Sequence, residues 1–255
     1  EMIMQPREPH YVGDGFRVHN FIPSGYGLDM YRMDPFILLD YNSKFNFPPS
    51  DRQRGVGVHP HRGFETVTIA YKGRIAHHDS FGGGGVIGEG DVQWMTAASG
   101  LLHKEYHEEE FSREGGEFHM VQLWVNLPAK DKMSHPKYQA IENGDMGRFD
   151  LEKEQGVIEV IAGEYKGAKG PATTFSPMHV MNAKLKEAGT AFFDFPSDYT
   201  TALLVVEGTV RVNGEKANTD HFVLMKKDGE TFKIEAMEDA IVLILSGEPI
   251  GEPIA

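Results

Sequence analysis

The chain has 255 residues, a formal net charge of −13 and no cysteine, which allows one large or two modest domains and excludes disulfides and thiol chemistry. A chain this acidic should repel phosphate backbones, so we expect no direct binding to nucleic acid. No apolar run is long enough to span a membrane and residues 1–6 do not resemble a signal peptide, which favours a cytoplasmic protein without a membrane anchor.

Short strands are predicted along the whole chain. In the first half they are expected at 36–40, 65–71, 91–96 and 117–127, and in the second half at 157–161, 179–185, 191–195, 203–206, 209–212, 223–225, 232–234 and 241–245. A turn is predicted at Tyr41-Asn42, after the first of these strands. No stretch has a helical period of 3.6, so helices should be few and short. We therefore predict an all-β fold of two facing β-barrels, formed by residues 1–138 and 139–255.

Two pairs of metal-ligand side chains frame the segment from residue 59 to residue 105. His59 and His61 form the first pair, and His103 and Glu105 form the second. Side chains at i and i+2 of a strand project from the same face. If the two strands meet in one barrel, three imidazoles and one carboxylate converge on a mononuclear metal site. The alternative is a structural cluster of hydrogen-bonded histidines.

Glu65 is a rival for the carboxylate ligand. It lies an even number of residues from His59 and His61, so on a continuous strand it would project from the same face. It stands beyond His61 by roughly 13 Å along a strand that rises about 3.3 Å per residue. Reaching the same ion would therefore require a sharp bend, which Gly63 could permit. Glu105 needs no bend. We expect Glu105 to bind the metal and Glu65 to orient a ligand histidine.

Other side chains near these motifs have either a role in the site or a structural role. His77 and His78 lie on opposite faces of a return strand, so at most one can approach the site, and each is predicted to be a surface or hydrogen-bonded histidine. Phe64, Trp94 and Met95 are candidate walls of an apolar substrate pocket, with core packing as the alternative.

The motif His-Pro-His-Arg-Gly-Phe-Glu-Thr-Val-Thr at 59–68, together with the segments 88–97, 103–105 and 122–128, resembles the pirin family of the cupin superfamily. The resemblance covers almost the whole chain and implies a bicupin with two cupin-type β-barrels. It implies one non-haem Fe(II) in the first barrel, held by His59, His61, His103 and Glu105. Ordinary cupins use a glutamate at the position of Glu65, and pirins use the position of Glu105 instead. Nickel, zinc, copper or manganese could occupy the same ligands in a purified sample.

A weak internal repeat relates 67–73 to 202–208. Aligning the two segments without gaps places other residue types at the ligand positions: Asp194 and Pro196 for His59 and His61, Thr200 for Glu65, and Glu238 and Ala240 for His103 and Glu105. Ten of the twelve histidines precede residue 140. The second barrel is therefore predicted to lack metal ligands, with one ion per chain.

The resemblance implies quercetin 2,3-dioxygenase activity, in which a flavonol binds the metal through its 3-oxygen, O2 adds across the 2,3 bond and carbon monoxide leaves. Glu105 would accept the proton of the flavonol hydroxyl. The alternative is a metal-containing regulatory protein that binds a transcription factor or a metabolic enzyme without turnover. An aerobic assay with quercetin separates the two.

The ends of the chain carry two further expectations. Pirin-like chains typically continue past a Gly-Glu-Pro turn like the one at 247–249 into a further segment, so we expect this chain to be shortened at its C-terminus, with that segment either absent or beyond Ala255. The first residue is Glu1 and not methionine, so the native chain is expected to start elsewhere.

Overall fold

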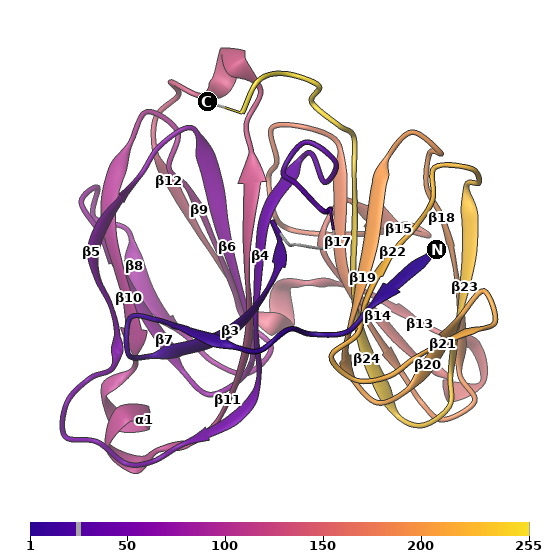
Figure 1. The fold of residues 1–255 in the computed structure, drawn as a ribbon, viewed down its shortest axis with the longest axis horizontal. Helices are drawn as coiled ribbons and strands as arrows, with labels where there is room; N and C mark the ends of the chain where they lie inside the picture. Colours follow the sequence, from indigo (N-terminus) through magenta and orange to yellow (C-terminus); the bar gives the residue numbers. More distant parts are fainter. Residues whose placement is uncertain (24–26, 255) are drawn as a thin grey trace. The chain divides into compact units, whose positions relative to one another are not determined.

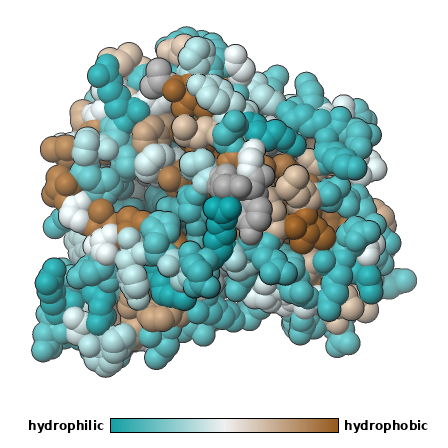
Figure 2. All heavy atoms as spheres, in the orientation of Figure 1, coloured by the Kyte–Doolittle hydropathy of each residue, from teal (hydrophilic) through white to brown (hydrophobic). Residues whose placement is uncertain are grey.

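The computed structural model describes residues 1–23 and 27–254, and most of them form short strands (Figure 1). The prediction of an all-β fold is confirmed. In the described residues the helices are short: α1 (Glu109–Glu114) and the 3-10 helices Ala129–Asp131, Asn143–Asp145 and Glu152–Glu154. No helix in this part of the chain is long and apolar enough to cross a membrane. Figure 2 shows a largely hydrophilic face on which apolar residues form separate groups.

The chain packs as two compact units. One consists of residues 7–144 with the C-terminal segment from Ile250, and we call it the first barrel; the other consists of residues 1–6 and 145–249, and we call it the second barrel. Each unit therefore includes one end of the chain. The backbone N–H of Gly251 donates to Asp34 Oδ2 at 2.7 Å in the first barrel. The limits of the predicted domains, 1–138 and 139–255, stay a prediction.

The first barrel consists of two sheets. A seven-stranded sheet has the order β12-β9-β6-β11-β4-β3-β2, and a four-stranded sheet has the order β5-β10-β7-β8. The strands are β2 (His10–Val12), β3 (Phe16–Ile22), β4 (Phe36–Phe47), β5 (Gly55–His61), β6 (Phe64–Lys72), β7 (Ile75–Asp79), β8 (Gly84–Ile87), β9 (Val92–Thr96), β10 (Leu101–His107), β11 (Gly116–Asn126) and β12 (Lys137–Ile141). The inner strand β6 is rich in β-branched and aromatic residues and is buried along almost its whole length, as this composition favours.

The turn predicted at Tyr41-Asn42 is wrong, because β4 continues to Phe47. The pairing of β4 with β11 shifts register beside Asn42, which marks a β-bulge. The Asn42 side chain accepts the backbone N–H of Arg17 at 2.9 Å. At this position the asparagine supports a bulge inside a long strand, so the chain does not reverse there.

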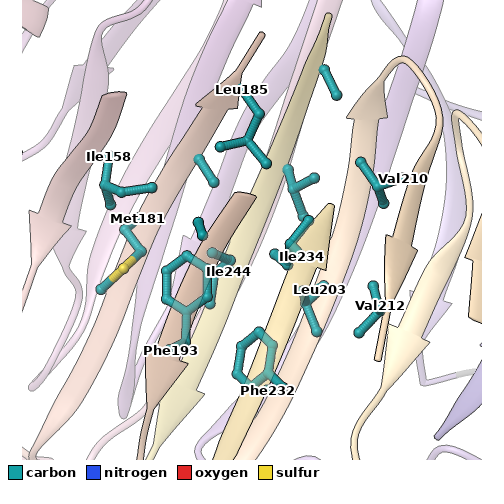
Figure 3. Close-up of a cluster of buried hydrophobic side chains, with 14 of the residues drawn as sticks. Ile158, Met181, Leu185, Phe193, Leu203, Val210, Val212, Phe232, Ile234 and Ile244 are labelled. Atoms are coloured by element: carbon teal, nitrogen blue, oxygen red, sulfur yellow. The ribbon is translucent and has the colours of Figure 1, made fainter. Parts of the chain in front are cut away.

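The second barrel repeats the same arrangement. Its sheets have the orders β1-β22-β19-β24-β17-β14-β13 and β18-β23-β20-β21, which match the first barrel strand for strand. The strands are β1 (Met2–Met4), β13 (Gly147–Asp150), β14 (Gly156–Ala162), β17 (Met178–Leu185), β18 (Thr190–Asp194), β19 (Thr200–Glu207), β20 (Val210–Val212), β21 (Glu215–Ala217), β22 (Phe222–Leu224), β23 (Thr231–Ala236) and β24 (Ala240–Gly247), with a separate hairpin of β15 (Glu164–Tyr165) and β16 (Ala168–Lys169). Its interior is a large apolar cluster that includes Phe193, Phe232 and Ile234 (Figure 3).

The strand ladders define which positions of the two barrels are equivalent. Gly73 follows β6 and Gly208 follows β19, both with positive φ. Two residues later Ile75 pairs with His107 and Val210 with Ala236. Counting back from His107 along β10 and from Ala236 along β23 makes Glu105 equivalent to Ile234 and His103 equivalent to Phe232. The partners of these strands on β5 and β18 then make His59 equivalent to Phe193 and His61 equivalent to Phe195. The ungapped alignment to Asp194, Pro196, Glu238 and Ala240 is therefore wrong, because the connections between strands differ in length.

Candidate metal centre

Three histidine rings converge inside the first barrel. His103 on β10 lies directly across the ladder from His59 on β5, and its neighbour Leu101 lies across from His61. The ring centroids are 4.4 Å apart for His59 and His103, 4.6 Å for His61 and His103, and 4.8 Å for His59 and His61. One ring nitrogen from each lies within 4.8 Å of the others. The pairing of β5 with β10 thus brings together the predicted imidazoles.

Glu105 lies in a second group that shares His103. Its carboxylate is grouped with His77 and His103, again within 4.8 Å, and among the described residues no group unites all four predicted ligands. The pairing of β10 with β5 shifts register between His103 and Glu105, so Glu105 lies across from Val56 on β5, whereas on the other side of β10 it lies across from His77 of β7 in regular pairing. The extra residue belongs to β5, so Glu105 keeps the face of His103, but the β5 residue opposite it is Val56.

Polar side chains of the barrel interior hold the Glu105 carboxylate. The Gln93 amide donates to Oε1, and the Thr68 hydroxyl lies 3.0 Å from the same oxygen. The Tyr138 hydroxyl donates to Gln93 Oε1 at 3.3 Å, which fixes the orientation of that amide. Burial raises the pKa of Glu105 to about 7, and the hydrogen bonds from Thr68 and Gln93 oppose the rise.

Glu65 lies outside both histidine groups. The chain turns at Gly63, whose φ is +83° and whose N–H donates to Ala98 O, so Glu65 belongs to β6 and not to the strand of His59 and His61. The alternation of side chains along the strand of His59 and His61 therefore does not predict the direction of the Glu65 side chain. The Thr96 hydroxyl donates to Glu65 Oε1 at 2.7 Å, and burial raises the pKa of this carboxyl to about 7.

The environment of His61 and His103 favours the neutral form of both rings. Burial, followed by the neighbouring histidines, lowers the pKa of His61 to about 4 and that of His103 to about 2. A metal ion needs the neutral ring, which offers a lone pair. His59 Nδ1 lies 2.7 Å from the Gly57 carbonyl, which can only accept, so Nδ1 carries the hydrogen and Nε2 the lone pair. That lone pair is directed at His103 Nε2, 2.9 Å away. This donor set fits a bound cation.

His77 is a buried, hydrogen-bonded histidine, one of the two states predicted for it, and its partners belong to the centre. It is fully buried, its Nδ1 lies 3.2 Å from His103 Nδ1, and its Nε2 lies 3.3 Å from Asp79 Oδ2. His78 lies on the opposite face, where its Nδ1 contacts the Tyr106 hydroxyl at 2.7 Å. The sequence analysis overlooked Asp79. The signal was present, because His77 and Asp79 form a same-face i, i+2 pair like the two that were recognised.

An apolar pocket opens beside the histidines. It is lined by His59, His61, Glu105, Gln122, Trp124, Met120, Phe16, Val12, Val18, Val56, Leu38 and Asp40. Trp124 lies against His61 with ring centroids 5.1 Å apart and stacks on Phe64 at 4.5 Å. Of the wall residues proposed from sequence, Phe64 contacts His61 at 5.1 Å, whereas Trp94 and Met95 are buried in the core. Trp124 is the aromatic wall residue that the sequence analysis missed.

Comparison with known proteins assigns the family. The Pirin family profile matches residues 15–125, and the profile of the pirin C-terminal cupin domain matches residues 180–255. A Pseudomonas aeruginosa protein named "Putative quercetin 2,3-dioxygenase PA2418" is 49% identical over 245 residues, which cover 96% of this chain and 85% of that protein.

Solved structures agree with this assignment. A quercetin 2,3-dioxygenase from Acinetobacter baumannii is 47% identical with a TM-score of 0.93 and covers 100% of this chain and 88% of its own. The bacterial pirin YhhW from Escherichia coli, solved in complex with nickel(II), is 19% identical with a TM-score of 0.71, covers 97% of this chain and 100% of its own, and shares the fold. The prediction of cupin-type barrels is thereby confirmed. The histidine centre, the repeated barrel and both profile matches lead to one conclusion: the chain belongs to the pirin family.

Proposed function

We propose that the protein is a metal-dependent dioxygenase that cleaves flavonols such as quercetin with O2, using one metal ion held by His59, His61, His103 and Glu105. The observation that carries this proposal is the convergence of three imidazoles on one point, two of them buried and that of His59 half-buried, beside a carboxylate and an apolar pocket. The names of the Pseudomonas and Acinetobacter relatives support the choice of substrate.

The expected ion is Fe(II), and the nickel in the Escherichia coli pirin supports a general affinity of such sites for divalent metals. Bound at these ligands, the ion supplies a Lewis acid and the capacity to react with dioxygen. Glu105 is grouped with His77 and His103, and His103 also belongs to the group of His59 and His61, so these side chains would hold the ion from two neighbouring groups.

The residues of the pocket bind and orient the substrate in this proposal. Trp124 and Phe16 offer aromatic and apolar surface to a planar polyphenol, and enclosure by such walls excludes water from the reacting face. Glu105 lines the same pocket, so its carboxylate can accept the proton of the flavonol 3-hydroxyl. The products expected are carbon monoxide and the ring-opened ester that retains both atoms of O2.

The test is anaerobic loading with Fe(II), measurement of metal per chain, and then addition of quercetin and air. Loss of the flavonol absorbance with release of one carbon monoxide per quercetin supports the proposal. Glu105→Gln should abolish turnover, because it removes the proton acceptor and weakens metal binding. A fully loaded protein that leaves quercetin and related flavonols unchanged would contradict the enzyme and favour the regulatory alternative.

A further inference from the structure

We infer that Asp79 and His77 are positioning residues that hold His103 in the tautomer whose Nε2 lone pair faces the metal site. The inference rests on the metal centre proposed above and extends it to a chain of three side chains on two strands. His103 on β10 lies directly across the ladder from Asp79 on β7, and His77 lies across from Glu105. All three side chains are buried: His77 at 0%, Asp79 at 2% and His103 at 1% exposed.

The chain begins at a carboxylate with a fixed orientation. Asp79 Oδ1 accepts the backbone N–H groups of Phe81 at 2.8 Å and Gly83 at 3.0 Å. These two bonds leave Oδ2 directed at His77 Nε2, 3.3 Å away. An ionised carboxylate can only accept, so His77 Nε2 carries the hydrogen of this contact.

The direction of each hydrogen bond then follows along the chain. A neutral imidazole has one donor and one acceptor nitrogen, so His77 Nδ1 is an acceptor when Nε2 donates. His103 Nδ1 lies 3.2 Å from His77 Nδ1 and must therefore be the donor. His103 Nε2 is then left with a lone pair, as a metal ligand requires.

His59 reaches the same state by a separate route. Its Nδ1 donates to the Gly57 carbonyl, and its Nε2 lies 2.9 Å from His103 Nε2. Two lone pairs that face each other at this distance repel, so the hydrogen bonds at the two Nδ1 atoms hold an unfavourable contact that a bound cation relieves. The Asp79–His77 pair and the Gly57 carbonyl thus fix two ligands before the ion arrives.

The decisive variant is Asp79→Asn. Its side-chain oxygen should keep the bonds from Phe81 and Gly83, so the new amide NH2 faces His77 Nε2. His77 then accepts at Nε2 and carries its hydrogen on Nδ1. His103 is driven to the opposite tautomer, with a hydrogen on Nε2 where the metal should bind. We expect the dissociation constant for Ni(II), measured by chelator competition without quercetin or O2, to rise about 10–100-fold.

Asp91→Asn is the control for the loss of a carboxylate that supports a turn, and it is the harsher change locally, because each oxygen of Asp91 accepts a backbone N–H. Asp91 also accepts backbone N–H groups in the first barrel, from Gly88 at 3.0 Å and Asn143 at 2.9 Å, but these bonds involve no histidine. A general loss of a turn-supporting carboxylate should affect both variants alike. An unchanged Ni(II) affinity in the control, against a weakened one in Asp79→Asn, supports the positioning role.

A second measurement needs no substitution. Imidazole 15N chemical shifts of the metal-free protein should show His103 and His59 protonated at Nδ1 and His77 protonated at Nε2. In Asp79→Asn the His77 and His103 assignments should reverse. His103 protonated at Nε2 in the unsubstituted protein, Ni(II) bound at His77, or no Ni(II) binding at all would overturn the inference. Normal tautomers and Ni(II) binding without quercetin turnover would contradict only the proposed activity.

Discussion

The two barrels place different side chains at equivalent positions of the same strand arrangement. In the first barrel the rings of His59, His61 and His103 lie 4.4–4.8 Å apart. In the second barrel the equivalent Phe193, Phe195 and Phe232 lie 5.1–6.2 Å apart. Glu105 and His77 are matched by Ile234 and Val212, both fully buried. One strand framework thus surrounds either a polar centre or a continuous apolar core.

The comparison shows that a binding centre requires hydrogen bonds in the interior that an apolar core does not need. Phe193, Phe195, Phe232 and Ile234 all belong to the apolar cluster that fills the second barrel. In the first barrel the corresponding space holds buried polar groups that must each find a partner, because unpaired polar groups are costly in an apolar interior. The hydrogen bonds from His77 to Asp79 and from Gln93 and Thr68 to Glu105 meet that requirement.

The largest effect is expected when a residue of the second barrel is placed in the first. His103→Phe removes a ligand shared by both donor groups, so the protein should retain no metal. The metal-free protein should stay folded but lose about 1–3 kcal/mol, because His77 loses its hydrogen-bond partner. Metal per chain by mass spectrometry and unfolding in urea check both parts. Retention of one ion per chain would show that His103 is not a ligand.

The second prediction concerns the phenylalanines that occupy the histidine positions in the second barrel and their effect on its stability. Phe193 is 2% exposed and stacks on Phe232 with ring centroids 5.1 Å apart. Phe193→Ala should therefore lower the free energy of unfolding by about 3–5 kcal/mol through the cavity it leaves. The metal content of the folded variant should not change. Denaturant unfolding with metal analysis tests this, and a cost below about 1 kcal/mol would contradict a tightly packed core.

The sequence was informative where the chemistry follows local spacing. The pairs His59 and His61, and His103 and Glu105, could be recognised because strand side chains alternate. His77 and Asp79 have the same spacing, but their contact with His103 could not be predicted, since it depends on which strand lies beside β10 and in what register. For the same reason the bulge beside Asn42 looked like a turn, and the ungapped repeat missed Phe193 and Phe232.

The smallest effect concerns Glu65, the carboxyl that ordinary cupins would use as a ligand. Burial raises its pKa from 4.5 to about 7 in the folded protein, and Thr96 donates to it. Between these values the folded state binds more protons than the unfolded state, so this group lowers the free energy of unfolding as the pH rises. A shift of this size corresponds to about 3 kcal/mol. Glu65→Gln removes the ionisation and keeps a polar partner for Thr96.

The variant should therefore gain stability relative to the unsubstituted protein as the pH rises from 5 to 8, with both proteins kept metal-free by a chelator. Urea unfolding of both proteins at each pH measures the difference in their free energies of unfolding. The histidines titrate in both proteins, so their contributions cancel in this difference. In the presence of metal, Glu65→Gln should keep most of the bound ion, whereas Glu105→Gln should lose it. Parallel stability curves would contradict the raised pKa. An ion lost only from Glu65→Gln would show that the ligand is the glutamate of ordinary cupins.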